Sequence, residues 1–244
     1  MSIPIPVQPR TLVVIPARNE AATVASVVHA ARQALPCDVL VVNDASSDDT
    51  SARARTAGAR VLDLALHLGA WGAVQAGLRY AHRRGYARVA TMDADGQHHA
   101  EALPALIATF DCEGAHVLIG SCEQRLSLPK RIAWRYFRAL TGLKVRDFTS
   151  GMRVYDREAL RVLSAPAASL LDYQDIGVLM LLAHSGLAMR EVPIAMSPRQ
   201  VGGSRVFSSW HMVARYMLAT TLLCVARLEP GPRLRHGRQP VPSA

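Results

Sequence analysis

The hydrophobic pattern of the first hundred residues alternates between strand-like and helix-like segments. Four short runs are mostly apolar and have the composition of strands: 11–15, 39–42, 60–64 and 89–92. The stretches between them carry apolar residues at helical spacing: 23–35, about 50–58 and 71–84. Buried strands separated by helices predict an α/β fold, with a mostly parallel sheet that is covered by helices on both faces.

Three clusters of polar residues follow strands of this predicted sheet. They cover residues 17–20, 43–49 and 93–99. The carboxyl ends of parallel strands lie at one edge of a sheet, and ligands of such sheets bind outside that edge. We therefore expect the three clusters to converge on a binding site.

The third cluster contains two carboxylates, Asp93 and Asp95, separated by one small residue. Alternate residues of an extended segment point to the same side, so the two carboxylates face one way. Mg²⁺ and Mn²⁺ prefer oxygen ligands, and Mg²⁺ often takes one or two carboxylates together with substrate phosphates. The pair is typical of a site for a divalent ion that arrives with a diphosphate, although Asp and Gly are also common turn residues.

Composition limits the class of protein and of partner. The 244 residues are 50% hydrophobic and 19% charged, as in a globular chain rather than a disordered one. The four cysteines lack ligand spacing, and residues 2–7 are too short and Pro-broken for a signal peptide, so we expect reduced thiols and a cytoplasmic location. A net charge of +9 favours a polyanionic partner: phosphate-bearing substrates, an anionic membrane surface or nucleic acid. The cations are scattered along the chain and no RNA-binding aromatic signature is present, so we do not expect nucleic acid to be the partner.

Six motifs occur in the order seen in family 2 glycosyltransferases: 14–20, 41–50, 92–98, 147–155, 191–194 and 199–205. The chain resembles this family from about residue 11 to residue 228, and it is most similar to the branch of dolichyl-phosphate mannose synthases and polyprenyl-phosphate sugar synthases. The resemblance implies a GT-A fold, a nucleoside-diphosphate sugar as donor and inversion at the anomeric carbon.

The resemblance also implies roles for individual residues. The donor nucleotide would contact Pro16, Ala17, Arg18, Asn19, Glu20, Asp44, Asp93 and Ser204. Asp93 and Asp95 would bind Mg²⁺ or Mn²⁺, and Gln97 would belong to the catalytic residues. His98 adjoins the metal pair and is a further candidate for the metal or the phosphates. By contrast, the cluster Asp48, Asp49 and Thr50 is typical of a helix N-cap.

Two segments depart from the family pattern. The segment 67–73 begins with His67 where relatives show an Asn and a basic, Gly-rich turn. Cys122 stands where relatives often have an arginine, for which Arg125 could substitute. These departures bear on the choice of nucleotide and on an anion contact near the acceptor.

Arg199 and Arg205 flank a glycine-rich loop that, by resemblance, closes over the donor. A guanidinium there would neutralise the leaving diphosphate as its bond to the sugar breaks. A solvated basic loop is the alternative.

The acceptor is either a phosphate or a hydroxyl. A phosphate monoester is already anionic, whereas a hydroxyl benefits from a carboxylate base. Asp175 matches the aspartate of hydroxyl-glycosylating relatives, and Gly177 stands where the polyprenyl-phosphate branch is acidic. We expect transfer to a polyprenyl phosphate at the cytoplasmic membrane face, with transfer to a glycan hydroxyl by Asp175 as the alternative.

Two segments mix basic, aromatic and aliphatic residues in a way that suits a membrane surface. They are 130–140 and 207–228. The run of consecutive uncharged residues in the second segment is too short to span a bilayer. Packing of either helix on the core is the alternative. The expected organisation is an N-terminal extension at 1–10, a glycosyltransferase domain at 11–206, an amphipathic helix at 207–228 and a basic, Pro-rich disordered tail at 229–244, with peripheral membrane contact.

Overall fold

The computed structural model describes residues 10–122, 128–171, 175–197 and 210–228. Its strands are β1 (Thr11–Ala17), β2 (Asp38–Asn43), β3 (Arg60–Asp63), β4 (Arg88–Thr91), β5 (Val117–Ser121), β6 (Arg153–Asp156) and β7 (Met189–Pro193). Its α-helices are α1 (Val24–Ala34), α2 (Thr50–Thr56), α3 (Gly69–Arg83), α4 (Leu103–Glu113), α5 (Leu128–Thr141), α6 (Arg157–Ser164), α7 (Ile176–His184) and α8 (Trp210–Leu228). Two short 3₁₀ helices cover Ala100–Ala102 and Pro166–Leu170.

One seven-stranded sheet organises the chain in the order β3-β2-β1-β4-β6-β5-β7. Strands β1 to β4 are mutually parallel, and β7 is parallel to β5. Only β6 is antiparallel among the described strands, and it lies between β4 and β5. The mostly parallel α/β sheet that the hydrophobic pattern predicts is therefore confirmed, and all four predicted strands belong to it.

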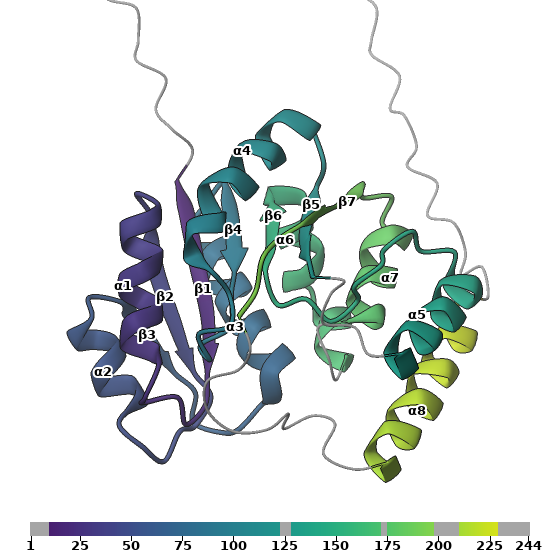
Figure 1. Cartoon of the computed structure of the whole chain (residues 1–244), viewed down its shortest axis with the longest axis horizontal. Helices are drawn as coiled ribbons and strands as arrows, with labels where there is room; N and C mark the ends of the chain where they lie inside the picture. The colour runs from purple at the N-terminus through teal and green to yellow at the C-terminus, as the bar shows by residue number, and fades with distance from the viewer. Residues whose placement is uncertain (1–9, 123–127, 172–174, 198–209, 229–244) are drawn as a thin grey trace, which may run out of the picture.

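Helices cover both faces of the sheet, as Figure 1 shows. Alternating strand residues point to opposite faces. Leu12 and Val14 of β1 pack with α3, whereas Val13 and Ile15 pack with α1 and α4. Helices α5 to α8 extend the first of these two layers beyond β5. The same alternation along the other strands makes two hydrophobic cores, one on each face.

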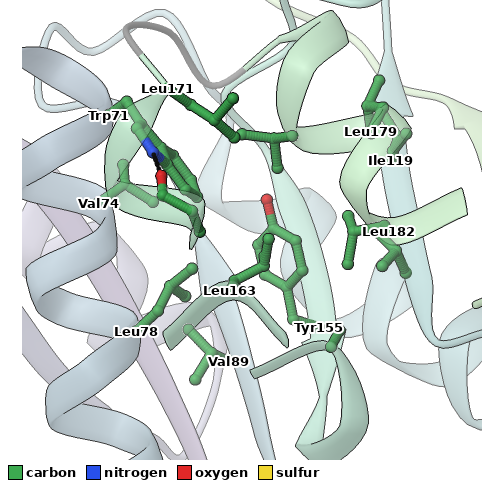
Figure 2. Close-up of a cluster of buried hydrophobic side chains, with 14 of the residues drawn as sticks. Trp71, Val74, Leu78, Val89, Ile119, Tyr155, Leu163, Leu171, Leu179 and Leu182 are labelled. Carbon is green, nitrogen blue, oxygen red and sulfur yellow. Dashed lines mark hydrogen bonds between the residues drawn. The ribbon is translucent and has the colours of Figure 1, made fainter. Parts of the chain in front are cut away.

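The core beside α3 contains a buried tryptophan with a polar anchor. Trp71 lies at the start of α3 and packs with Val74 and Leu78 against Tyr155 of β6 (Figure 2). Its indole Nε1–H donates a hydrogen bond of 2.7 Å to the carbonyl oxygen of Ala168. A buried tryptophan is stabilised by such a partner, because an unpaired N–H in the core is costly. This contact fixes the beginning of α3 near the carboxyl edge of the sheet.

The C-terminal helix α8 packs on the body through a stripe that differs from the one its apolar pattern suggests. The sequence favours a stripe that includes Met217, Thr221 and Val225, but the buried residues are Tyr216, Thr220 and Cys224. Both stripes have helical spacing, and the helix is uncharged around most of its circumference, so periodicity cannot select the face that packs. No helix among the described residues is long and apolar enough to cross a bilayer. The proposed boundaries at 206 and 229 lie outside the described residues.

Candidate functional site

The polar segments after β1 and β2 form one connected shelf at the carboxyl edge of the sheet. The backbone N–H of Asp44 donates to the carbonyl oxygen of Ala17 at 2.9 Å. Asn19 accepts a hydrogen bond from the N–H of Ser47 at 2.8 Å, and its own N–H donates to Ser46 Oγ at 3.0 Å. Asn19 adopts a positive φ of 52°, which asparagine tolerates better than most residues. The structure thus brings 17–20 and 43–49 together, as the sequence predicts.

Asp48 ties this shelf to the start of α2. Its carboxylate accepts hydrogen bonds from the backbone N–H groups of Ala21 at 3.1 Å and Thr50 at 3.0 Å. Burial alone would raise the pKa of Asp48, but the hydrogen bonds from Thr50 and Ala21 outweigh it and lower that pKa. Asp49 precedes α2 without a side-chain cap. The expected structural role therefore falls on Asp48.

Asp44 lies at the end of β2 and is almost completely buried, with 4% of its side chain exposed. One carboxylate oxygen accepts the N–H of Leu68 at 2.7 Å, and the other accepts the N–H of Gly69 at 3.0 Å. The second oxygen also lies 2.7 Å from His67 Nδ1. The His67 Nε2 in turn lies 2.6 Å from Arg18 Nη1. Asp44, His67 and Arg18 therefore form a chain of hydrogen bonds at the carboxyl edge of the sheet.

Asp93 follows β4 and presents its carboxylate at the same edge, with 43% of the side chain exposed. The antiparallel register pairs Thr91 with Arg153, so two residues further on Gly151 lies opposite Asp93. A Cβ added to Gly151 would lie 2.4 Å from Asp93 Oδ1 and 2.6 Å from Oδ2. A side chain at position 151 would therefore displace the carboxylate, and glycine leaves the space that it occupies.

His98 supports the turn that carries Asp93. Its ring is buried, and Nδ1 accepts the backbone N–H of Asp93 at 3.1 Å. The other nitrogen, Nε2, is buried without a hydrogen-bond partner among the described residues. This burial indicates a structural role for His98 rather than the metal or phosphate contact that its position in the sequence suggests.

Asp93 and Asp95 are the residues that fit a divalent metal. Asp95 Oδ1 accepts the N–H of Gln97 at 3.1 Å, which shapes the turn after β4. Within the described ranges, no group of three or more His, Cys, Asp or Glu side chains is arranged to hold a metal. Two carboxylates with open positions are the donor set of a cation that completes its coordination with substrate phosphate oxygens and water.

Two carboxylates, the buried Asp147 and the half-buried Glu191, hold the motif that contains Gly151. Glu191 of β7 accepts the backbone N–H groups of Arg146 at 2.9 Å and Asp147 at 2.8 Å. Asp147 in turn accepts the N–H of Thr149 at 3.0 Å. These bonds hold the loop before β6 in place. Two motifs of the family resemblance, 147–155 and 191–194, therefore act together to hold Gly151 opposite Asp93.

The segment after β7 returns to the turn that follows β4. Met196 forms an antiparallel bridge with His98, and the N–H of Ser197 donates to the carbonyl oxygen of Gln97 at 2.9 Å. The Ser197 hydroxyl lies 2.9 Å from His99 Nε2. Arg199, Ser204 and Arg205 lie outside the described residues, as does Arg125. Ser197, the last described residue before Arg199, is hydrogen-bonded to the carbonyl oxygen of Gln97. Gln97 lies two residues after Asp95 in the sequence.

Asp175 lies at the N-terminus of α7 and is buried. Tyr216 of α8 donates its hydroxyl to Asp175 Oδ2 at 2.6 Å. Burial raises the pKa of Asp175, against the opposing effects of this hydrogen bond, of the buried Arg153 and of the backbone N–H groups at 176 and 177. The carboxylate therefore links two helices, and the sequence offers no signal for its partner Tyr216.

Helices α5 and α8 lie side by side (Figure 1). Each exposes a stripe of hydrophobic side chains. On α5 the exposed stripe is Leu128, Ile132 and Tyr136; on α8 it is Leu218, Leu222 and Val225. The Tyr136 hydroxyl donates to Thr221 Oγ1 at 3.4 Å between the two helices. Trp134 and Phe137, which the sequence suggests as part of a membrane-facing mixture, are buried in the core instead, with Trp134 edge-on to Phe148.

The residues that sequence reasoning did not single out are Gly151 and Tyr216. Both act on a partner that is distant in the chain, Asp93 and Asp175 respectively. The glycine lies inside a recognised motif, which is the only signal that could have found it. His67 was visible as a departure from the family pattern, but its contact with Asp44 was not.

Comparison with known proteins agrees with this fold. The family model described as glycosyl transferase family 2 matches residues 12–164. An undecaprenyl-phosphate mannosyltransferase of Micrococcus luteus is 34% identical over 216 residues, which cover 81% of this chain and 87% of that protein. A polyprenol monophosphomannose synthase of Mycolicibacterium smegmatis is 32% identical over 218 residues, covering 82% of each.

Among solved structures, glucosyl-3-phosphoglycerate synthase of Mycobacterium tuberculosis in complex with Mn²⁺, uridine diphosphate and phosphoglyceric acid has a similar fold. Its TM-score is 0.69 at 22% identity, over 92% of this chain and 81% of that one. The family model covers strands β1 to β6 and the polar clusters that follow β1, β2 and β4. The chain therefore belongs to glycosyl transferase family 2, and it is a glycosyltransferase with a GT-A fold.

Proposed function

We propose that this glycosyltransferase moves a sugar from a nucleoside-diphosphate sugar to a polyprenyl phosphate, with inversion at the anomeric carbon. Two relatives above 30% identity, each covering more than four fifths of this chain, are named for polyprenyl-phosphate mannose transfer. This agreement over nearly the whole sheet is the observation that carries the proposal. Inversion follows from a single direct displacement, in which the acceptor oxygen attacks the carbon that the diphosphate leaves.

In this proposal the donor lies along the carboxyl edge, with its nucleoside on the shelf and its diphosphate at β4. The shelf residues are Pro16, Ala17, Arg18, Asn19, Glu20 and Asp44. Asp93 and Asp95 would hold Mg²⁺ or Mn²⁺, and Asp93 would also contact the donor. Such an ion, when bound, neutralises charge that develops on the leaving diphosphate.

The remaining catalytic positions follow from the segment that begins at Ser197. Because Ser197 is bonded to Gln97, the loop that carries Arg199, Ser204 and Arg205 starts beside the metal pair. In this proposal the guanidinium groups of Arg199 and Arg205 neutralise the departing diphosphate, and Ser204 contacts the donor. Gln97, which is buried in the turn, holds the start of this loop close to the reacting atoms.

The contacts of Asp175 favour a phosphate acceptor over a hydroxyl acceptor. A general base must reach the proton that it abstracts. Asp175 is instead buried, and one of its oxygens accepts the Tyr216 hydroxyl. A phosphate monoester brings its own negative charge and requires orientation, not deprotonation. An Asp175 that links α7 to α8 is therefore compatible with a lipid-phosphate acceptor.

One observation supports the alternative, transfer to a hydroxyl of a lipid-linked or cell-surface glycan. Burial raises the pKa of Asp175 above the ordinary value for an aspartate. A raised pKa brings a carboxylate closer to the working pH and makes it a better proton acceptor. In this alternative, Asp175 would become exposed to the acceptor when the donor is bound.

Asp175→Asn distinguishes the two acceptors. The asparagine retains an oxygen that accepts from Tyr216, but it cannot take a proton. We expect the variant to transfer sugar to polyprenyl phosphate at a rate within about threefold of the wild type, because the step needs no base. The measurement is transfer of radiolabelled sugar from GDP-mannose or UDP-glucose into the organic phase, with Asp95→Asn as the inactive control. A loss of turnover of about 100-fold with intact nucleotide binding would support the hydroxyl alternative.

We further propose that the exposed stripes of α5 and α8 make a peripheral contact with the cytoplasmic face of the cytoplasmic membrane. Leu128, Ile132, Leu218 and Leu222 are exposed on two adjacent helices. Neither helix contains an Asp or a Glu, whereas α5 carries Lys130, Arg131, Arg135 and Arg138. Aliphatic side chains flanked by cations suit the interface of an anionic bilayer.

Liposome flotation tests this contact. The double variant Ile132→Ser with Leu222→Ser removes one leucine-sized side chain from each stripe, and we expect about tenfold weaker binding to vesicles containing phosphatidylglycerol. Leu66→Ser is the matched control, because Leu66 is equally exposed in the loop after β3. Equal flotation of the double variant and the control would contradict the membrane contact.

A further inference from the structure

The carboxylate of Asp44 is occupied by the loop that begins α3. Its oxygens accept from the N–H groups of Leu68 and Gly69 and lie against His67 Nδ1. Gly69 has a φ of 80°, the left-handed region that lets two successive N–H groups point at one carboxylate. A carboxylate has about four acceptor positions, so three of them are used within the protein. Asp44 therefore has about one acceptor position left for a direct contact with the donor.

The chemistry of the partners assigns the proton on His67. A guanidinium has only donors, so Arg18 Nη1 donates to His67 Nε2 across the 2.6 Å contact. The Nε2 is then unprotonated, and the proton lies on Nδ1, which donates to Asp44 at 2.7 Å. The imidazole thus accepts on one side and donates on the other. It transmits the orientation of a buried carboxylate to an exposed arginine.

We infer that His67 is a positioning residue for donor binding, which holds the Arg18 guanidinium toward the nucleoside diphosphate while Asp44 acts through it. The inference rests on the proposed use of a nucleoside-diphosphate donor. Arg18 directly follows β1, on the shelf that faces the nucleotide edge. Its donors suit acceptor atoms of the nucleotide, either the carbonyl oxygens of a base or the oxygens of the diphosphate.

A matched pair of substitutions separates the hydrogen bonds from the shape of the side chain. His67→Phe keeps a flat ring but removes both nitrogens. His67→Gln keeps one donor and one acceptor, because its amide can donate to Asp44 and accept from Arg18. Binding of GDP and of UDP to the full-length protein, measured by calorimetry with Mn²⁺, identifies which nucleotide is recognised.

We expect His67→Phe and Arg18→Ala each to weaken binding of the preferred nucleotide about tenfold, and His67→Gln to remain within about threefold of the wild type. Adding His67→Phe to Arg18→Ala should weaken binding by less than about twofold more, because the histidine acts through the arginine. Binding of Mn²⁺ alone should be unchanged in all variants, whereas a collapsed site would lose it.

Independent effects of the two substitutions, multiplying in the double variant, would overturn the inference. So would unchanged nucleotide binding in His67→Phe. Either result would leave the proposed function intact, because the wild type would still bind the donor nucleotide. Failure of the wild type to bind GDP or UDP would instead overturn both the proposed donor and the role of His67.

Discussion

At the scale of single residues, the position of the Asp93 carboxylate depends on the absence of a Cβ at Gly151. Gly151 lies opposite Asp93 across the β4–β6 register, and its Cα hydrogen faces the carboxylate. The Cβ of any other residue would come within 2.4 Å of Asp93 Oδ1, closer than such contacts allow. The identity of residue 151 therefore controls the position of a proposed metal ligand 58 residues away in the sequence. The hydrogen bond from Thr91 Oγ1 to the Gly151 carbonyl also holds the two segments together.

Gly151→Ala should move the Asp93 carboxylate and reduce turnover by about 100-fold, as small misplacements at reacting centres do. The fold should persist, since the added methyl group lies at the exposed edge. Mn²⁺ titration and turnover measure the effect. Gly114→Ala serves as control, because Gly114 adopts a φ of 60° at the end of α4, and that strain costs stability without affecting the site. Normal metal affinity and turnover in Gly151→Ala would contradict the proposed role of Asp93.

At the scale of elements, a buried hydrogen bond between described residues joins α8 to α7. Tyr216 lies between the apolar contacts of α8 and the N-terminus of α7, where it donates to Asp175. Burial and the neighbouring carboxylate raise the pKa of the Tyr216 phenol, so the hydroxyl keeps its proton and remains a donor. The contact therefore couples the attachment of α8 to the structure around Asp175, the candidate general base.

Tyr216→Phe should lower the free energy of unfolding by about 2 kcal/mol, because Asp175 remains buried and loses a donor. Tyr136→Phe is the matched control, in the contact between α5 and α8. Its hydroxyl contacts Thr221 at 3.4 Å in an exposed position, so its loss should cost less than about 0.5 kcal/mol. Urea denaturation gives both values. Equal stability of the two variants would show that the Asp175 contact does not hold α8.

At the scale of the whole molecule, acidic groups in the β1–β3 half respond to pH in the opposite sense to Asp175. Hydrogen bonds from Tyr86 and Arg10 lower the pKa of Asp38, at the amino end of the sheet. A hydrogen bond from Asn43, with others from Arg55 and Ser51, lowers the pKa of Asp63. A lowered pKa adds stability above the unfolded value of about 3.9, and this stability is lost as the pH falls through the folded pKa.

The free energy of unfolding should therefore rise between about pH 3 and about pH 5. Asp175 opposes this trend, because its raised pKa adds stability at low pH that is lost as the pH rises. Asp38→Asn should flatten the rise, whereas Glu113→Gln, at an exposed position of α4, should leave it unchanged. Urea midpoints across this range test the assignment. A parallel rise in Asp38→Asn and the wild type would remove Asp38 as a contributor.

The sequence by itself determined the first four strands, the helices between them and the polar clusters at their carboxyl ends. These features depend on local patterns: apolar runs of strand length, helical spacing and turn residues. The ordered motifs also predicted the family, which the comparisons confirm. The assigned roles of Asp93, Asp95, Asp175 and the loop arginines stay predictions.

Which residues contact one another across the sheet and between helices is visible in the tertiary structure alone. The antiparallel register of β6 places Gly151 against Asp93, and the rotation of α8 selects Tyr216 for Asp175. The loop before α3 brings His67 to Asp44. Each contact joins segments far apart in the chain, so its geometry depends on sheet order, register and helix rotation. Local patterns of hydrophobicity do not encode these quantities, because several registers and faces satisfy the same pattern.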